Sequence, residues 1–213
     1  MPKGRVDEQA AGAGVTARGA ATRARIVATA ADLMRVRGIG GTTLDDVVAA
    51  SKVSKSQLYR NFADKPALVR AVIELVGEQT IARHRAHLEN VRTLAGLRRW
   101  RDAVLERNAL QHGRYGCALG SLANEFSDQD EVARQQLDEL FGTWHELFED
   151  VIRRFQQAGT IPQDADVDQL ATGFVAAVQG GYLLAQTSRD IAPMAAAIDM
   201  AIEHVRLLGT ASA

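Results

Sequence analysis

The sequence contains a single cysteine, Cys117, among 213 residues, so a disulfide bond within the chain is excluded. Prolines number only four, and aromatic residues make up 5% of the chain. No apolar run approaches the roughly 18 residues that a membrane-spanning helix needs, and the N-terminus has no apolar signal segment. We therefore expect a cytoplasmic protein with no membrane partner, and not a disulfide-stabilised secreted domain.

The residues that are abundant favour helices. Hydrophobic residues make up 46% of the chain and charged residues 24%, with alanine prominent. The alternating β-branched pattern of strands is scarce. The sequence predicts an all-α fold of about nine helices. The expected helices cover residues 22–37, 43–51, 55–61, 64–89, 95–111, 117–127, 130–158, 166–188 and 192–208.

The formal net charge of −1 conceals an uneven distribution. Residues 1–66 carry 11 Lys and Arg against six Asp and Glu, whereas residues 67–213 carry 14 against 20. A basic head on an acidic body indicates a head that meets a polyanion such as nucleic acid. The alternative is an ordinary solvated surface, since an imbalance of this size is common.

Residues 51–62, SKVSKSQLYRNF, are mostly polar, with a few apolar residues spaced among them. The spacing Ser54-x-x-Gln57 is typical of a capping box and predicts a short helix over 55–61. Leu58 and Phe62 share one face of that helix, which we expect to be buried. The other side carries varied hydrogen-bonding groups, as base edges and phosphates require: Lys55, Ser56, Gln57, Tyr59 and Arg60. With the preceding helix this arrangement predicts a helix-turn-helix, although a plain helical hairpin with a solvated face remains an alternative.

Residues 22–73, TRARIVATAADLMRVRGIGGTTLDDVVAASKVSKSQLYRNFADKPALVRAVI, resemble the N-terminal DNA-binding domain of TetR-type transcriptional regulators. The glycine turn, the TTLDD cap, the VSKSQLYR-x-F segment and the DK-x-x-L start of the next helix follow the family's order and spacing. The remaining helices match its effector domain in length and number. GCALGSLANE (116–125) is similar to a segment in one branch, where it opens a helix beside the ligand pocket.

The resemblance implies a homodimeric repressor, less often an activator, that binds a palindromic operator and leaves it when a small apolar or amphipathic effector binds. It implies a DNA-binding domain over 20–66 and an effector and dimerisation domain over 67–213. Residues 1–19 are rich in Gly and Ala, with scattered charge and no helical period, which predicts a disordered basic arm. Dimerisation would use 166–188 and 192–208. The implied DNA-binding residues are Thr43, Ser54, Lys55, Ser56, Gln57, Tyr59, Arg60 and Lys65.

Three positions in the head depart from the family pattern. Val48 stands where the family usually has Ala, which predicts a slightly wider crossing of the second and third helices. Lys52 stands where the family often has Gly, which predicts a turn conformation that Gly prefers. Asn61 stands where the family often has His or Tyr at a phosphate contact. Gln57 has two possible roles, because it can cap the helix or read a base.

An effector site would be an apolar cavity with a few polar groups. The candidate residues are Trp100, Phe126, Trp144, Phe148 and Gln179, the last a polar residue within an apolar helix. Cys117 is either a sensor thiol or a small buried hydrophobe. We favour the buried hydrophobe because no cationic cluster flanks Cys117 in the sequence.

The main rival class is an enzyme, and the sequence argues against it. No G-x-S-x-G nucleophile elbow is present. His84-x-x-His87 lacks a third metal ligand at a suitable spacing, and the carboxylates from Glu125 to Asp150 are spread as on a solvated face. We expect no metal and no cofactor. A second rival is a DNA-binding regulator without small-molecule control, which a cavity-free body would favour.

Overall fold

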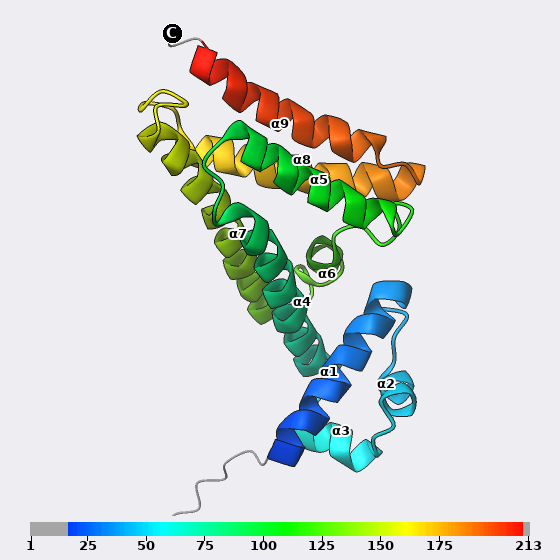
Figure 1. Ribbon diagram of the computed structural model, residues 1–213. Helices are drawn as coiled ribbons and strands as arrows, with labels where there is room; N and C mark the ends of the chain where they lie inside the picture. Colours follow the sequence, from blue (N-terminus) through cyan, green and yellow to red (C-terminus); the bar gives the residue numbers. More distant parts are fainter. Residues whose placement is uncertain (1–16, 211–213) are drawn as a thin grey trace, which may run out of the picture.

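The computed structural model describes residues 17–210, which form nine helices and no strand, so the all-α prediction is confirmed (Figure 1). The helices are α1 (Ala17–Arg37), α2 (Leu44–Ser51), α3 (Lys55–Asn61), α4 (Lys65–Leu88), α5 (Leu94–Ala109), α6 (Ala118–Phe126), α7 (Glu131–Gln157), α8 (Val167–Ser188) and α9 (Ala192–Thr210). Apart from the start of α1, every end lies within two residues of its expected position. Helix α1 begins inside the stretch expected to be an arm, and residues 1–16 of that arm lie outside the described residues.

Side-chain caps explain why the short helices of the head begin where they do. Thr43 and Asp46 form a capping box at the start of α2, and Ser54 and Gln57 form one at the start of α3. Asp64 accepts a hydrogen bond from the backbone of Ala67 at the start of α4. These caps satisfy backbone N–H groups that a short helix would otherwise leave unpaired.

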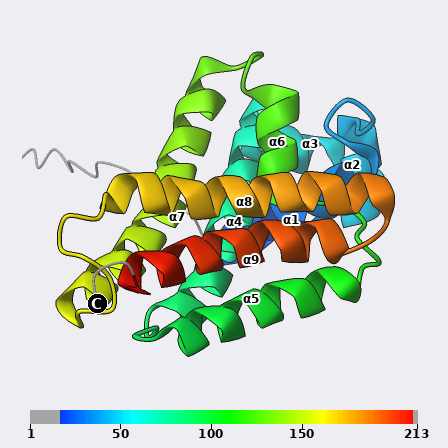
Figure 2. The ribbon, with the colours of Figure 1, turned by 90° about the horizontal axis from the view of Figure 1, so that it is seen from above.

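The helices form a small head and a larger body (Figure 1). Helices α1–α3 make the head, and α4 leads from it into the body alongside α7. At the far end α5, α9 and α8 lie side by side, as the view from above shows (Figure 2). Helix α6 lies between the head and these far helices, so it is placed to contact both.

One apolar core runs through the described part of both regions. In the head it includes Ile26 of α1 and Leu58 of α3, and in the body it includes Trp144 of α7. Helix α4 contributes buried residues along its length, from Leu68 to Leu88. Because head and body share one close-packed core, a shift of α4 or α6 must be felt in the head.

None of the helices in residues 17–210 is long and apolar enough to cross a membrane.

Candidate nucleic-acid interface and effector cavity

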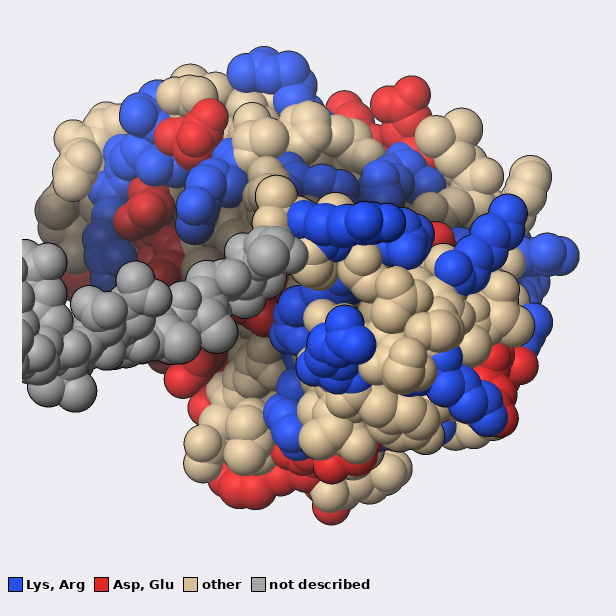
Figure 3. Space-filling model, turned by 90° about the horizontal axis from the view of Figure 1, so that it is seen from below, with Lys and Arg blue, Asp and Glu red and all other residues tan. Residues whose placement is uncertain are grey.

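Helix α3 presents its polar face outward because its apolar residues are fully used in the core. Leu58 and Phe62 are 0% and 2% exposed, whereas Tyr59 is 56% exposed. Lys55, Ser56 and Arg60 are also exposed. Lys and Arg side chains gather on the underside of the molecule, at the end occupied by the head (Figure 3).

The turn between α2 and α3 passes through a left-handed residue. Lys52 has φ 55° and ψ 37°, so the predicted Gly-like conformation at this position is confirmed. A residue with a Cβ is strained there, by roughly 1 kcal/mol relative to Gly. The turn directs the chain from α2 into α3.

The two suggested roles of Gln57 use different atoms of its side chain. Its Oε1 accepts a 2.8 Å hydrogen bond from the backbone N–H of Ser54, while Ser54 Oγ accepts from the backbone of Gln57. Its Nε2 has no hydrogen-bond partner within residues 17–210. The cap therefore leaves the amide donor of Gln57 available to a base acceptor.

Other candidate DNA contacts already hold partners in the head. Lys55 Nζ lies 2.8 Å from Asp45 Oδ1, and this hydrogen bond raises the pKa of the Lys55 ammonium group. The Thr43 hydroxyl donates to Asp46 at 2.6 Å. Lys55 and Thr43 must therefore release or share these partners to bind a phosphate.

The peptide groups of Ile39 connect three parts of the molecule. The carbonyl of Ile39 accepts a 2.6 Å hydrogen bond from Lys65 Nζ at the start of α4. Its N–H donates at 2.6 Å to Oε2 of Glu125, near the end of α6. This pair of bonds fixes the turn after α1 to both α4 and α6.

The body contains a cavity of about 490 Å³, which we call the inner cavity. Its lining includes Trp100, His84, Val104, Trp144 and Tyr182. Trp100 Nε1 donates a 3.1 Å hydrogen bond to His84 Nδ1, and burial lowers the pKa of His84 to about 3. The imidazole is therefore neutral at physiological pH, and this side of the cavity is aromatic and uncharged.

Two buried polar atoms of inner-cavity residues have no partner within the described chain. They are Nε1 of Trp144 and Oδ1 of Asn108. A buried polar group without a hydrogen bond costs about 1–3 kcal/mol. Such atoms therefore favour a site that a polar ligand completes.

A second cavity, of about 670 Å³, lies between the head and the body, and we call it the junction cavity. It is lined by Met34 of α1, Val76 of α4, and Leu122 and Glu125 of α6. Glu125, whose carboxylate accepts the hydrogen bond from Ile39, thus lines the junction cavity. The junction cavity and the inner cavity share six lining residues.

Two family models match the chain. Residues 26–72 match the model for bacterial regulatory proteins of the tetR family, and residues 91–201 match the tetracyclin repressor-like C-terminal domain. The chain belongs to the TetR family. Members of this family are DNA-binding transcriptional regulators rather than enzymes, as we expected.

Relatives and solved structures agree with this TetR-family assignment. The HTH-type transcriptional repressor DhaR of Mycobacterium sp. (strain GP1) is 27% identical over 81% of this chain and 86% of its own. The regulatory protein TetR from Rhodobacter sphaeroides superposes with a TM-score of 0.77, at 22% identity over 86% of this chain and 98% of its own. The regulator CifR, a cysteine mutant solved with a 26-bp double-strand operator DNA, superposes with a TM-score of 0.71, at 21% identity over 84% and 94% of the two chains.

The five candidate effector residues fall into two groups. Trp100 and Trp144 line the inner cavity, whereas Phe126, Phe148 and Gln179 line neither cavity. Phe126 and Phe148 are buried in the core. Gln179 Nε2 lies 3.4 Å from the sulfur of Cys117, which is itself buried at the N-cap of α6.

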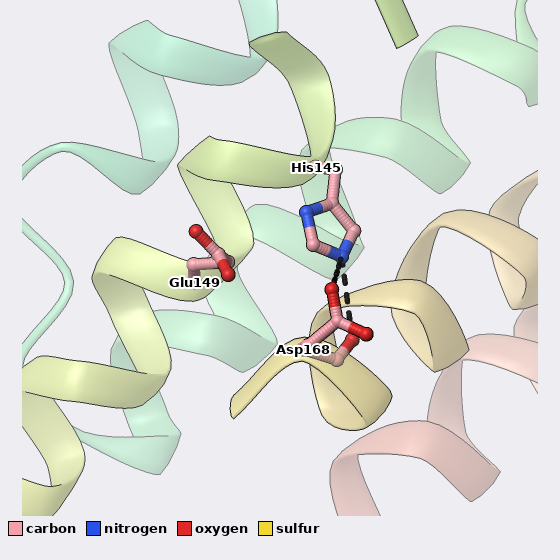
Figure 4. Close-up of side chains that lie close together, drawn as sticks. All are labelled: His145, Glu149 and Asp168. Atoms are coloured by element: carbon pink, nitrogen blue, oxygen red, sulfur yellow. Dashed lines mark hydrogen bonds and ion pairs between the residues drawn. The ribbon is translucent and has the colours of Figure 1, made fainter. Parts of the chain in front are cut away.

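A histidine and two carboxylates meet where α8 packs on α7 (Figure 4). Their potential ligand atoms, from His145, Glu149 and Asp168, lie within 4.8 Å of one another. However, His145 Nε2 is 3.3 Å from the backbone oxygen of Asp168 and 3.2 Å from Thr172 Oγ1, and Glu149 pairs with Arg153 at 3.1 Å. The His145 contacts hold the start of α8 against α7, whereas the Glu149–Arg153 pair lies within α7.

Sequence reasoning missed the residues that join separate helices. Glu125 was grouped with the solvated carboxylates, but it is half-buried and bonds the head. Its place in the GCALGSLANE segment was the available signal. No sequence pattern marked the arginines that line the cavities, because they lie far apart in the sequence and meet only in the folded chain.

Proposed function

We propose that this TetR-family protein is a homodimeric repressor that binds a palindromic operator and is released by a small molecule in the inner cavity. The main support for operator binding is the exposed polar face of α3, which points outward because Leu58 and Phe62 are buried in the core. The name of the relative DhaR supports repression, and the operator complex of CifR supports the same use of the shared fold.

The candidate DNA contacts divide by chemistry. Arg60, Ser56 and the free amide of Gln57 suit base edges in a major groove. The other five suit backbone phosphates, because their groups are cationic, hydroxyl-bearing or close to helix starts. This second set comprises Thr43, Ser54, Lys55, Tyr59 and Lys65.

An exposed apolar face on α8 and α9 supports dimerisation. Leu183 and Leu184 of α8 and Met200 and Leu207 of α9 are each about half exposed or more in the single chain. A Cβ at Gly180 would meet nothing within 4 Å, so the α8 backbone is open to close approach by a second copy. Two-fold symmetry would place two α3 helices on successive turns of one DNA face.

Helix α6 supports a route from cavity to DNA. Its N-cap, Cys117, and its first residue, Ala118, line the inner cavity, and Glu125 near its end accepts a hydrogen bond from Ile39. A ligand that displaces α6 would pull on the turn after α1 and on Lys65. The inner cavity also favours ligand control over a regulator with no small-molecule effector.

The test of operator binding is selection of genomic fragments by the full-length protein at physiological salt. We expect enrichment of a palindrome whose half-sites are about one DNA turn apart. A bound pool without any shared palindrome would contradict the proposal.

Two substitutions would then separate base reading from phosphate binding. Arg60→Ala should relax sequence preference by about 1–3 kcal/mol at its base pair. Lys65→Ala should weaken binding to every duplex and lower its salt dependence. Arg99→Gln, on the exposed surface of α5, is the control and should bind like wild type. Unchanged binding by both head variants would show that the assigned face is wrong.

A further inference from the structure

The inner and junction cavities share a wall of arginine side chains. Four arginines line both cavities, and they come from α1, α4, α5 and the loop after α5. They are Arg35, Arg83, Arg107 and Arg114. Like charges repel, so a cluster of this kind favours the binding of an anion.

The described part of the chain supplies no such anion to three of these arginines. Within residues 17–210, no carboxylate lies within 4.0 Å of a guanidinium nitrogen of Arg83, Arg107 or Arg114. Among the residues that the structure describes, Arg83 donates only to the hydroxyl of Thr80, at 3.0 Å. Burial, followed by the charge of Arg107, lowers the pKa of Arg83. The charged form of Arg83 is therefore less stable than that of a solvated arginine.

The carboxylates that line these cavities do not neutralise the cluster. Glu125 is occupied by the backbone of Ile39. Glu106 of the inner cavity forms no ion pair among the described residues, and Asp32 approaches only Arg35, at 4.0 Å. The cluster therefore keeps a net positive charge.

The other side of the inner cavity is apolar and rich in hydrogen-bond donors. Trp100 and Trp144 supply indole rings, and His84 is uncharged. Burial raises the pKa of Tyr182 to about 12, so its phenol keeps its proton and can donate. Within residues 17–210, Trp144 Nε1 is a further donor without a partner. Within the described chain these two donors face one acceptor without a partner, Asn108 Oδ1, so the cavity suits a ligand with more acceptors than donors.

We propose that the effector is an amphipathic organic anion whose acidic group binds Arg83, Arg107 and Arg114, and whose apolar part packs on Trp100 and Trp144. The acidic group is a carboxylate or a phosphate monoester, both of which accept paired hydrogen bonds from guanidinium groups. This inference rests on the proposed function, because it takes the inner cavity as the effector site.

Arg35 gives the anion a direct connection to the head. It belongs to α1, its guanidinium carbon lies 4.7 Å from the ring centroid of Tyr115, and it lines both cavities. A bound anion would attract Arg35 away from this stack and toward the body. Helix α1 would follow, and the position of α3 on DNA would change with it.

The chain's only two tryptophans both line the inner cavity, so their fluorescence reports occupancy directly. The probes are a panel of arylalkyl acids, each with its neutral amide, together with the matching phosphate monoesters. One set is 4-phenylbutyrate, 4-phenylbutyramide and 3-phenylpropyl phosphate. We expect at least one acid or phosphate to bind about tenfold or more tightly than its amide, which corresponds to about 1.4 kcal/mol. Comparison of the two anions identifies the acidic group.

Substitutions test whether the arginines cause the preference. Arg107→Gln and Arg114→Gln alter exposed side chains, so the fold should persist. Each should reduce the preference for the anion severalfold and leave amide binding unchanged. Arg99→Gln, an exposed arginine of α5 outside both cavities, should keep the wild-type preference.

The test of anion binding and the test of operator binding can fail independently of each other. If every amide in the panel binds as tightly as its acid, the anion inference is overturned, even when operator selection succeeds. The same conclusion follows if the preference survives both arginine variants. If no operator is selected while the preference is present, the proposed regulator fails and the anion site stands.

Discussion

The backbone N–H of Ile39 donates a 2.6 Å hydrogen bond to Oε2 of Glu125, and this bond joins the head to α6, which begins beside the inner cavity. The close fit extends to Gly38, where an added Cβ would lie 3.0 Å from the same carboxylate oxygen. Gly38 also has φ +74°, a value that glycine adopts readily. Glu125 is therefore the main polar contact through which α6 can influence the turn after α1.

Glu125→Ala should separate effector binding from operator release. We expect a loss of about 1–3 kcal/mol in the free energy of unfolding, because the N–H of Ile39 loses its partner. The effector should still bind, but a higher concentration should be needed to release DNA. Urea unfolding and operator titration with and without effector measure both effects. Asp128→Ala, an exposed carboxylate just after α6, is the control, and wild-type release by Glu125→Ala would contradict the coupling.

Lys52→Gly should stabilise the head. Lys52 is left-handed, with φ 55°, and glycine adopts this conformation without steric cost. We expect a gain of about 1 kcal/mol in the free energy of unfolding, measured by urea denaturation. Lys52→Ala removes the same charge but keeps a Cβ, so it should give no gain. Equal stability of the two variants would mean that the charge of Lys52, and not its backbone conformation, determines the change in the free energy of unfolding.

His84 should make the protein less stable in mild acid. Its folded pKa of about 3 is far below the 6.5 of the unfolded chain, so the unfolded state binds the extra proton. The contribution is complete above pH 6.5 and is lost as the pH falls toward 3. Between pH 7 and pH 5 we expect a loss of about 2 kcal/mol.

His84→Gln is the matched variant for this pH effect, because its amide oxygen can still accept the hydrogen bond from Trp100. Urea unfolding at pH 7, 6 and 5 should show a steeper decline for wild type than for the variant. Parallel declines would mean that His84 is not buried in its neutral form.

Leu184→Asp should disrupt the dimer that we propose. A carboxylate in the centre of an apolar interface would be buried without a partner, which costs several kcal/mol. Sedimentation should give a monomer whose helical content is unchanged, because Leu184 is 52% exposed in the single chain. Val132→Asp, at an exposed position of α7 away from that face, should remain a dimer. A dimeric Leu184→Asp protein would place the interface elsewhere.

Local sequence signals predicted most of the fold. Caps such as Ser54 with Gln57 act within four residues, and the apolar spacing of Leu58 and Phe62 repeats within one turn. Such short-range patterns determine where helices begin and which face is buried. The left-handed conformation of Lys52 was predicted differently, from the resemblance to a family that often has Gly at this position.

The contacts that join the helices could not be predicted in this way. Glu125 and Ile39 are 86 residues apart, and Arg83 and Arg107 lie on different helices. Their proximity depends on how α4, α5 and α6 pack, which no local pattern specifies. Trp100 and Trp144 were predicted because large aromatic residues in the body have few places other than the core and the cavity.

Helix α4 is long enough for a small tilt to produce a large displacement at its far end. Its 24 residues form a rod about 36 Å long, with the inner cavity against its C-terminal half and the reading head at its N-terminal end. For a lever of this length, a tilt of about 5° moves the far end by about 3 Å, roughly the length of one hydrogen bond. Under the function that we propose, a ligand that displaces a few side chains against α4 would therefore move α3 far enough to break its contacts with DNA.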